Sequence, residues 1–169
     1  MKRRNFVKAL MAVGAVASVS LLTNSEEYIA MASDVKIEKL NLTASEWRGR
    51  LTDEEYRILR KSGTERAWTS PLNDEKRKGV FHCAGCDLPL FSSEMKYDSG
   101  TGWPSFFDVY KGHVGTKRDY GLFTPRTEYH CARCGGHHGH VFDDGPRPTG
   151  LRYCNNGVAL RFKPAAVEG

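Results

Sequence analysis

Two short phrases decide the fold: Phe81-His82-Cys83-Ala84-Gly85-Cys86 and Tyr129-His130-Cys131-Ala132-Arg133-Cys134. Both sulfurs of a Cys-x-x-Cys turn can point at one centre, so two such turns supply four thiolates. Four thiolates are the tetrahedral donor set that zinc takes in closed structural sites. The repeated phrase therefore predicts one structural zinc ion per chain, held by Cys83, Cys86, Cys131 and Cys134.

The gap of 44 residues between Cys86 and Cys131 is longer than that of a simple zinc ribbon. A metal ion would clamp distant parts of the chain, and its binding free energy would become folding free energy. A second interpretation stays open, because each cysteine pair could be a disulfide or a redox couple in an oxidising compartment. The matching context of the two pairs favours the metal.

Composition excludes several classes of protein. The 169 residues are 40% hydrophobic and 27% charged, which is ordinary for a globular domain and excludes disordered, collagen-like and multispan membrane proteins. Residues 1–32 hold four of the 25 basic and two of the 20 acidic residues, which leaves 21 and 18, a surplus of three. So small a surplus argues against a nucleic-acid partner. Five cysteines are few for a disulfide scaffold and cannot all pair.

Residues 1–32 are typical of an export signal. It begins with a basic segment, Lys2 to Lys8, followed by a 14-residue uncharged stretch, Ala9 to Leu22. A small-x-small cleavage pattern follows at Ala30 to Ala32. The run RRNFVK (Arg3 to Lys8) resembles the twin-arginine consensus. We expect cleavage near Ala32 and a location outside the cytoplasm, in the bacterial periplasm. An uncleaved membrane anchor is the alternative, although the apolar stretch is short for a bilayer.

The remaining chain divides into a lead-in over residues 33–43, one domain over residues 44–164 and a tail over residues 165–169. Two capping boxes, Thr43 to Glu46 and Thr52 to Glu55, predict short helices at the front of the domain. The second helix is expected over Asp53 to Lys61, ended by a left-handed Gly63. Short β-branched and aromatic runs after residue 79 predict a mainly β domain. The expected strands are Val80 to His82, Leu88 to Phe91, Phe106 to Tyr110, Leu122 to Tyr129, His140 to Phe142 and Val158 to Phe162.

Cys154 is the cysteine that the two turns leave over. A thiol attacks at neutral pH only when its pKa is depressed from about 8.5, and basic or hydrogen-bonding neighbours can do this. Candidate neighbours are His137, His138, His140 and Arg152. A buried core cysteine is the alternative, since free cysteine is often buried. The histidines fit acid–base work, or alternatively a second metal site.

The stretch Gly100 to Phe107 places Trp103 and two phenylalanines beside a glycine pair. A ring exposed at such a turn suits an apolar group that carries one polar atom, such as a methyl beside an oxygen. Core packing is the alternative for Trp103 and is the preferred interpretation for Phe107.

Four motifs in order, CAGCDLPLF, SGTGWPSF, CARCGGHHGHVFDDGP and RYCNNGVALRF, resemble peptide-methionine (R)-S-oxide reductase, the B-type methionine sulfoxide reductase. The resemblance covers about Ala44 to Pro164. It implies a mainly β fold of two antiparallel sheets, stapled by zinc away from the active site. It also implies reduction of the R epimer of methionine sulfoxide, mainly in oxidised proteins, with a thioredoxin-like reductant. We expect a monomer without stable membrane association.

The resemblance also implies roles for single residues. Cys154 matches the nucleophile, which attacks the sulfoxide sulfur and becomes a sulfenic acid. His140 matches the histidine near the sulfoxide oxygen, and His137 matches its companion. Asn156 matches a hydrogen-bonding asparagine, and Trp103 matches the ring against which the substrate methyl packs. In the same motifs, Asp144 matches a supporting acidic position.

The chain departs from the family pattern at Thr101, where many members have the cysteine that resolves the sulfenic acid as a disulfide. We therefore predict either that an external thiol reduces the Cys154 sulfenic acid directly or that turnover is slow. His138, Asn155 and Gly157 replace a leucine, an apolar residue and a serine. A zinc-stapled binding module and a thiol-disulfide oxidoreductase are the competing functions. The first leaves Cys154 unexplained, and the second lacks the usual βαβ context of its motif.

Overall fold

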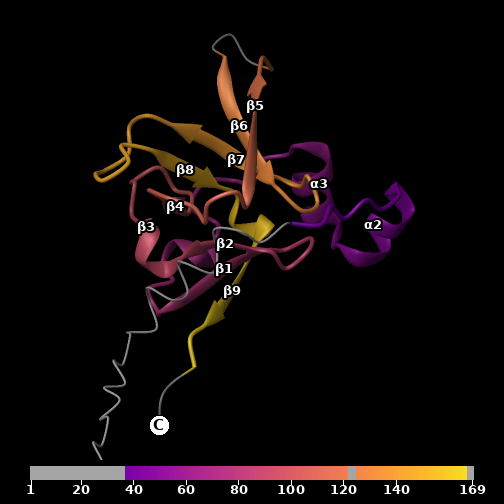
Figure 1. The fold of residues 1–169 in the computed structure, drawn as a ribbon, viewed down its shortest axis with the longest axis horizontal. Helices are drawn as coiled ribbons and strands as arrows, with labels where there is room; N and C mark the ends of the chain where they lie inside the picture. The colour runs from indigo at the N-terminus through magenta and orange to yellow at the C-terminus, as the bar shows by residue number, and fades with distance from the viewer. Residues whose placement is uncertain (1–36, 122–124, 167–169) are drawn as a thin grey trace, which may run out of the picture.

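The computed structural model describes residues 37–121 and 125–166, which form two antiparallel sheets with short helices at one side (Figure 1). The predicted mainly β fold with two antiparallel sheets is confirmed. The predicted export signal, residues 1–32, lies outside the described residues, as do residues 167–169 of the tail. Within the described ranges, no helix has both the length and the apolar character needed to cross a bilayer.

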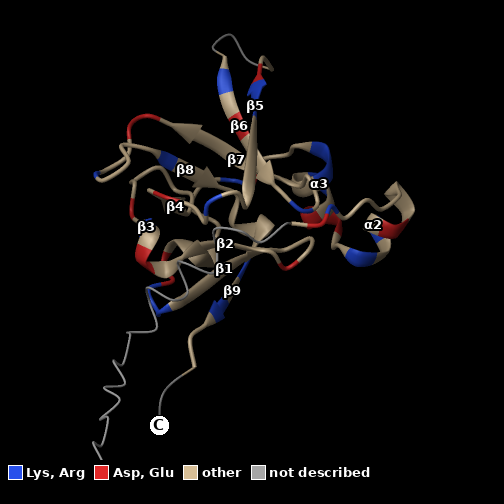
Figure 2. Ribbon diagram, in the orientation of Figure 1, with Lys and Arg blue, Asp and Glu red and all other residues tan. Residues whose placement is uncertain are grey.

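The helices α2 (Ala44–Arg50) and α3 (Asp53–Lys61) begin at Thr43 and Thr52, and both predicted capping boxes are present. Acidic residues occupy their first turns and basic residues their last turns, which complements the helix dipole (Figure 2). The predicted end of α3 is wrong in one respect, because Ser62 rather than Gly63 takes the left-handed conformation. A Cβ atom on Gly63 would crowd the carbonyl oxygen of Arg57, so close approach explains that glycine.

The small sheet has the strand order β2–β1–β9, and the large sheet has the order β3–β4–β8–β7–β6–β5. The strands of the small sheet are β1 (Gly79–Cys83), β2 (Pro89–Ser92) and β9 (Leu160–Pro164). Those of the large sheet are β3 (Lys96–Tyr97), β4 (Ser105–Phe106), β5 (Val114–Asp119), β6 (Arg126–Cys131), β7 (His137–Phe142) and β8 (Arg152–Asn155). Short 3-10 turns lie at Pro71–Asn73, Ser93–Met95 and Gly157–Ala159.

The sequence located β1 and β2 well but misjudged other strands. The strand expected over Phe106 to Tyr110 is only the pair Ser105–Phe106. The run expected from Leu122 begins instead at Arg126, with residues 122–124 outside the described part. Val158 lies in the 3-10 turn Gly157–Ala159, and the last strand begins at Leu160 instead. The strands β3, β5 and β8 were not expected at all, because their charged or polar residues leave no alternation of apolar and polar positions.

Aromatic side chains from both sheets form the core between them. Phe106 stacks on Phe91 at 4.1 Å between ring centroids and meets the edge of Phe81 at 5.0 Å. Tyr129 meets Phe91 edge-on at 6.3 Å, so the large sheet is joined to the small one through rings. The helix α3 adds buried Ile58 and Leu59 and packs against β7 and the Gly157–Ala159 turn. The core therefore fixes the position of the two strands that carry the candidate chemistry.

A single row of directly paired residues crosses all six strands of the large sheet. Tyr97 pairs with Ser105, Ser105 with Cys154, Cys154 with His140, His140 with Glu128, and Glu128 with Lys117. Directly opposed residues in an antiparallel sheet project from the same face. The register therefore brings Cys154 and His140 side by side on one face, from the neighbouring strands β8 and β7.

Candidate active site and metal centre

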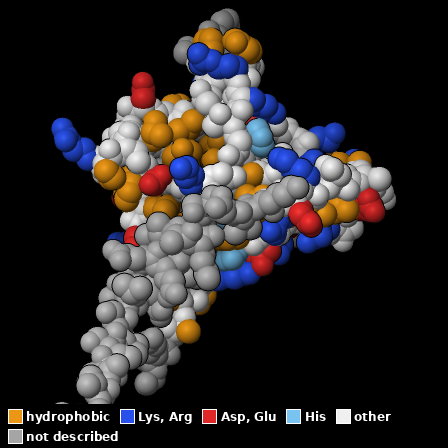
Figure 3. All heavy atoms as spheres, viewed as in Figure 1, with side chains coloured by type: hydrophobic (Ala, Val, Ile, Leu, Met, Phe, Trp, Pro, Cys, Tyr) orange, Lys and Arg blue, Asp and Glu red, His pale blue; other side chains and the backbone are white. Residues whose placement is uncertain are grey.

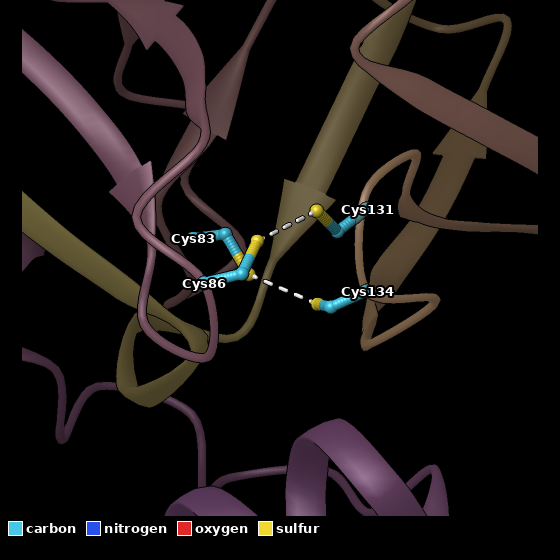
Figure 4. A group of neighbouring side chains, drawn as sticks. All are labelled: Cys83, Cys86, Cys131 and Cys134. Carbon is cyan, nitrogen blue, oxygen red and sulfur yellow. Dashed lines mark hydrogen bonds between the residues drawn. The ribbon is translucent and has the colours of Figure 1, made fainter. Parts of the chain in front are cut away.

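The two cysteine turns meet at one centre. Their four Sγ atoms lie within 4.8 Å of one another, and all four residues are buried (Figure 4). One turn joins β1 to β2 in the small sheet, and the other joins β6 to β7 in the large sheet. A metal ion at this centre would tie the two sheets together.

The donor set fits a tetrahedral cation. Sγ–Sγ separations are 3.6 Å for Cys83 to Cys134 and 3.4 Å for Cys86 to Cys131. A zinc ion with bonds of about 2.3 Å to four sulfurs would hold them about 3.8 Å apart. A disulfide would need about 2.05 Å, and all five cysteines are free. The alternatives of disulfides or separate redox pairs therefore find no support in the geometry.

Neighbouring side chains brace both turns from outside the cluster. Arg60 of α3 donates a hydrogen bond of 2.8 Å to the carbonyl oxygen of Cys134 and lies over the ring of Trp47. Arg133 donates one of 3.3 Å to the carbonyl oxygen of Cys86. Leu59 packs beside the second turn, where a Cβ atom on Gly136 would collide with it. Helix packing and the metal centre thus support each other.

The fifth cysteine stands apart from this cluster and lines a cavity on the large sheet. Trp103, His140, Asn156 and Arg126 line the same cavity. On the face drawn in Figure 3, hydrophobic side chains gather over β7 and β8, the strands that carry His140 and Cys154. The structure therefore brings together four of the five residues proposed for catalysis and substrate binding, while His137 does not line the cavity.

The Cys154 thiol is half-buried, and this burial raises its pKa. The charge of Arg152 and hydrogen bonds from Thr101 and Arg152 act in the opposite direction. Arg152 itself is fixed by two hydrogen bonds of 2.8 Å to the carboxylate of Asp144. The expected depressed pKa is therefore not reached in this state, although the basic and hydrogen-bonding neighbours that stabilise a thiolate are in place.

His140 is held by a carboxylate that the sequence did not reveal. Its Nε2 lies 2.7 Å from Oδ2 of Asp119, which also accepts a hydrogen bond of 2.8 Å from Arg126. Burial lowers the pKa of His140, whereas the bond to Asp119 raises it. Hydrogen bonds from the Gly121 amide, His140 and Arg126 hold the pKa of Asp119 below its usual range. His140 therefore faces the cavity with one nitrogen committed to an ionised partner.

His137 is buried beneath its proposed companion. A register irregularity in the pairing of β6 with β7 brings its ring to 5.6 Å from the ring of His140. Its Nδ1 lies 2.9 Å from Oε1 of Glu128, whose other oxygen pairs with Lys117 at 2.9 Å. Burial alone would raise the pKa of Glu128, but the bonds from His137 and Lys117 bring it below the usual value. His137 thus packs against His140 rather than against the cavity.

Glu65, which the sequence analysis did not single out, holds both Trp103 and Asn156. Its carbonyl oxygen accepts a hydrogen bond of 3.1 Å from Nε1 of Trp103, and its amide donates one of 2.9 Å to Oδ1 of Asn156. Its buried carboxylate accepts from the amides of Gly157 and Val158. Burial raises the pKa of this carboxylate, and the two amide bonds oppose the rise.

Two of the departures from the family pattern form one buried polar cluster. Tyr129 Oη donates a hydrogen bond of 2.6 Å to Oδ1 of Asn155, and Nδ1 of His138 lies 3.2 Å from the same oxygen. Burial lowers the pKa of His138 to about 3, so its ring is neutral. At Gly157 a Cβ atom would overlap the Ser70 hydroxyl, which explains why serine is absent there. The polar cluster borders the cavity through Asn155, which lines it beside Cys154.

Comparisons with known proteins agree with this arrangement. The SelR domain model matches residues 51–164. A peptide methionine sulfoxide reductase MsrB of Agrobacterium fabrum is 52% identical over 133 residues, which span 78% of this chain and 98% of that protein. A protein of the same name from Pseudomonas putida is 51% identical over 129 residues, 76% of this chain and 97% of its own length. The chloroplastic peptide methionine sulfoxide reductase B1 of Arabidopsis thaliana is 46% identical over 162 residues, 95% of this chain and 77% of its own.

We predict that Cys131→Ser destabilises the metal-loaded protein by more than about 3 kcal/mol, because metal binding contributes directly to folding. A chelator added to the unaltered protein should have the same effect. The measurement is chemical unfolding followed by circular dichroism, with metal content determined in parallel. Cys154→Ser is the matched control and should keep the unfolding midpoint. An unchanged unfolding midpoint after complete metal removal would contradict the contribution of the metal to folding.

Proposed function

The chain belongs to the SelR-domain family of peptide methionine sulfoxide reductases, and from this premise we propose that it reduces the R epimer of methionine sulfoxide, mainly in oxidised proteins, to methionine. The activity repairs oxidised proteins. The observation that carries the proposal is the meeting of Cys154, Trp103 and His140 at one cavity, while the other four cysteines form the metal centre.

The reaction begins when the Cys154 thiolate attacks the electrophilic sulfur of the sulfoxide. The oxygen passes to the cysteine sulfur, so methionine leaves and Cys154 becomes a sulfenic acid, the first stage of cysteine oxidation. Arg152 stabilises the thiolate through its charge and a hydrogen bond, and its own position is fixed by Asp144. This network gives Asp144 its supporting role.

The cavity lining sets the orientation of the substrate. The Trp103 ring, anchored through Glu65, offers an apolar wall for the substrate methyl group. His140 lies directly opposite Cys154 in the neighbouring strand and is placed to hydrogen-bond the sulfoxide oxygen and supply a proton. His137 acts on this arrangement through its ring contact with His140, and Asn156 lines the cavity, held by its bond to Glu65.

An external thiol completes the cycle, because Thr101 stands where a resolving cysteine would be and the remaining cysteines are committed to the metal centre. The thiolate of the reductant attacks the sulfur of the sulfenic acid, hydroxide leaves as water with one added proton, and a mixed disulfide forms. A second thiol of the reductant then releases Cys154. A thioredoxin-like protein is the proposed reductant, and the enzyme acts as a monomer.

We predict that the unaltered enzyme reduces a peptide carrying the R sulfoxide and leaves the S epimer unchanged. Cys154→Ser should lower the rate by at least about 10³-fold, as loss of a nucleophile does in other enzymes. The measurement is chromatography of the two separated epimers with dithiothreitol as reductant. Equal metal content in both proteins is the control for folding. Retained activity in the serine variant would show that another group attacks the substrate.

The metal is proposed to be zinc, since a buried set of four cysteines and no other donor is typical of structural zinc. Elemental analysis of the purified protein should find about one zinc per chain. Another metal in equimolar amount, or none in a folded protein, would overturn this assignment.

Residues 1–32 are proposed to direct export of the folded protein to the periplasm through the twin-arginine route, with cleavage near Ala32. Expression of the full chain in a bacterium, followed by fractionation and N-terminal sequencing, tests the proposal. The periplasmic protein should begin at Ser33 or close to it. Replacing Arg3 and Arg4 by Lys should abolish export, whereas the same replacement at Arg48 and Arg50 should not. A periplasmic protein that begins at Met1 would contradict cleavage.

A further inference from the structure

A chain of three hydroxyl groups runs through the segment before β4. Oγ of Ser99 lies 2.8 Å from Oγ1 of Thr101 and 2.7 Å from Oγ of Ser105. Ser105 is fully buried and donates a hydrogen bond of 3.2 Å to the carbonyl oxygen of Trp103. The chain therefore has a fixed acceptor at one end.

The other end of this hydroxyl chain reaches the nucleophile. Ser105 is paired directly with Cys154 across β4 and β8, which places the hydroxyl chain beside this residue. Thr101 acts on the Cys154 thiol as a hydrogen-bonding neighbour that lowers its pKa, against the effect of burial. The sheet register that places Cys154 thus also places Ser105, and Ser99 links Ser105 to Thr101.

The number of protons on the three hydroxyl groups determines how the hydroxyl chain responds when the Cys154 sulfur becomes charged. Each hydroxyl has one proton and can also accept. When Cys154 is a thiol, its S–H donates to Thr101, Thr101 to Ser99, Ser99 to Ser105, and Ser105 to the Trp103 carbonyl oxygen. When Cys154 is a thiolate, Thr101 turns its proton to the sulfur, Ser99 turns its proton to Thr101, and Ser105 turns its proton from the Trp103 carbonyl oxygen to Ser99. Successive hydrogen bonds of this kind polarise and strengthen one another.

We propose that Thr101, backed by Ser99 and Ser105, is a switchable hydrogen-bond donor that stabilises the thiolate of Cys154. Thr101 is then a catalytic residue in its own right, and Ser99 and Ser105 are positioning residues. The inference deepens the proposed function, because it concerns the nucleophile of that reaction. It also assigns Thr101, the residue at the position of the resolving cysteine, a role in the attack on the sulfoxide rather than in the reduction of the sulfenic acid.

Other charged and titratable groups near Cys154 act independently of this chain. They are Arg152 on β8, Asp144 in the preceding turn, Tyr97 on β3, His140 on β7 and Arg126 on β6. In the part of the chain that the structure describes, the Ser99 hydroxyl bonds to Thr101 and Ser105 rather than to any of these side chains. Removing the Thr101 hydroxyl therefore removes one donor and leaves these charges in place.

The test measures the rate at which iodoacetamide alkylates Cys154 as a function of pH, in the metal-loaded full chain, with the labelled site identified by mass spectrometry. Loss of a hydrogen bond to the charged form raises the pKa of a thiol. Thr101→Val should therefore move the midpoint of alkylation up by about one pH unit. Thr101→Ser should restore the midpoint, and Ser99→Ala should raise it by a smaller amount. Thr116→Val, on the exposed part of β5, is the matched control and should not move it.

Metal content shows whether each variant is folded, and Ser99→Ala keeps the proposal testable if Thr101→Val fails to fold. An unmoved midpoint in Thr101→Val would overturn the inference, as would an equal rise in Thr101→Val and Thr101→Ser. An unmoved alkylation midpoint in Ser99→Ala would overturn the role of the hydroxyl chain. Alkylation does not require reductase activity, so a shift in a protein that fails to reduce methionine sulfoxide would leave the inference standing and overturn the proposed function alone.

Discussion

The convergence of four buried cysteine sulfurs is the constraint on which the rest of the structure depends. One pair comes from the β1–β2 turn of the small sheet and the other from the β6–β7 turn of the large sheet. The described part of the chain is small, and its ring core alone joins the sheets over a limited area. A cation bound by thiolates adds its binding free energy to folding and fixes the start of β7. The strand that carries His140 is thereby anchored.

The position of β7 in turn determines which side chains lie beside Cys154. The register of β7 against β8 places His140 opposite Cys154, and that of β8 against β4 places Ser105 on its other side. A close approach makes this pairing possible, because a Cβ atom on Gly139 would overlap the carbonyl oxygen of Cys154. Cys154 thus lies in the middle of a row of polar side chains whose positions follow from sheet geometry. A metal held by the four clustered cysteines would add rigidity and would keep their sulfurs from competing with Cys154.

The parts of this arrangement that follow from local sequence could be predicted. The capping boxes at Thr43 and Thr52, the paired cysteine turns and the strand β1 are short-range patterns with a direct physical cause. The partners Asp119, Glu128 and Glu65 could not be predicted, because each reaches its site through pairings 9 to 92 residues away along the chain. The strand β8 was not predicted because its polar side chains give no alternation of apolar and polar residues.

The central claim is that four sulfurs are bound by a metal while Cys154 alone remains nucleophilic. Counting reactive thiols in the reduced, metal-loaded full chain with an aromatic disulfide reagent tests it most directly. We expect one of the five thiols to react in the native protein, and the remaining four only after chelator and denaturant release the metal in step with them. Reaction of further thiols without metal release, or an unreactive Cys154, would contradict the account.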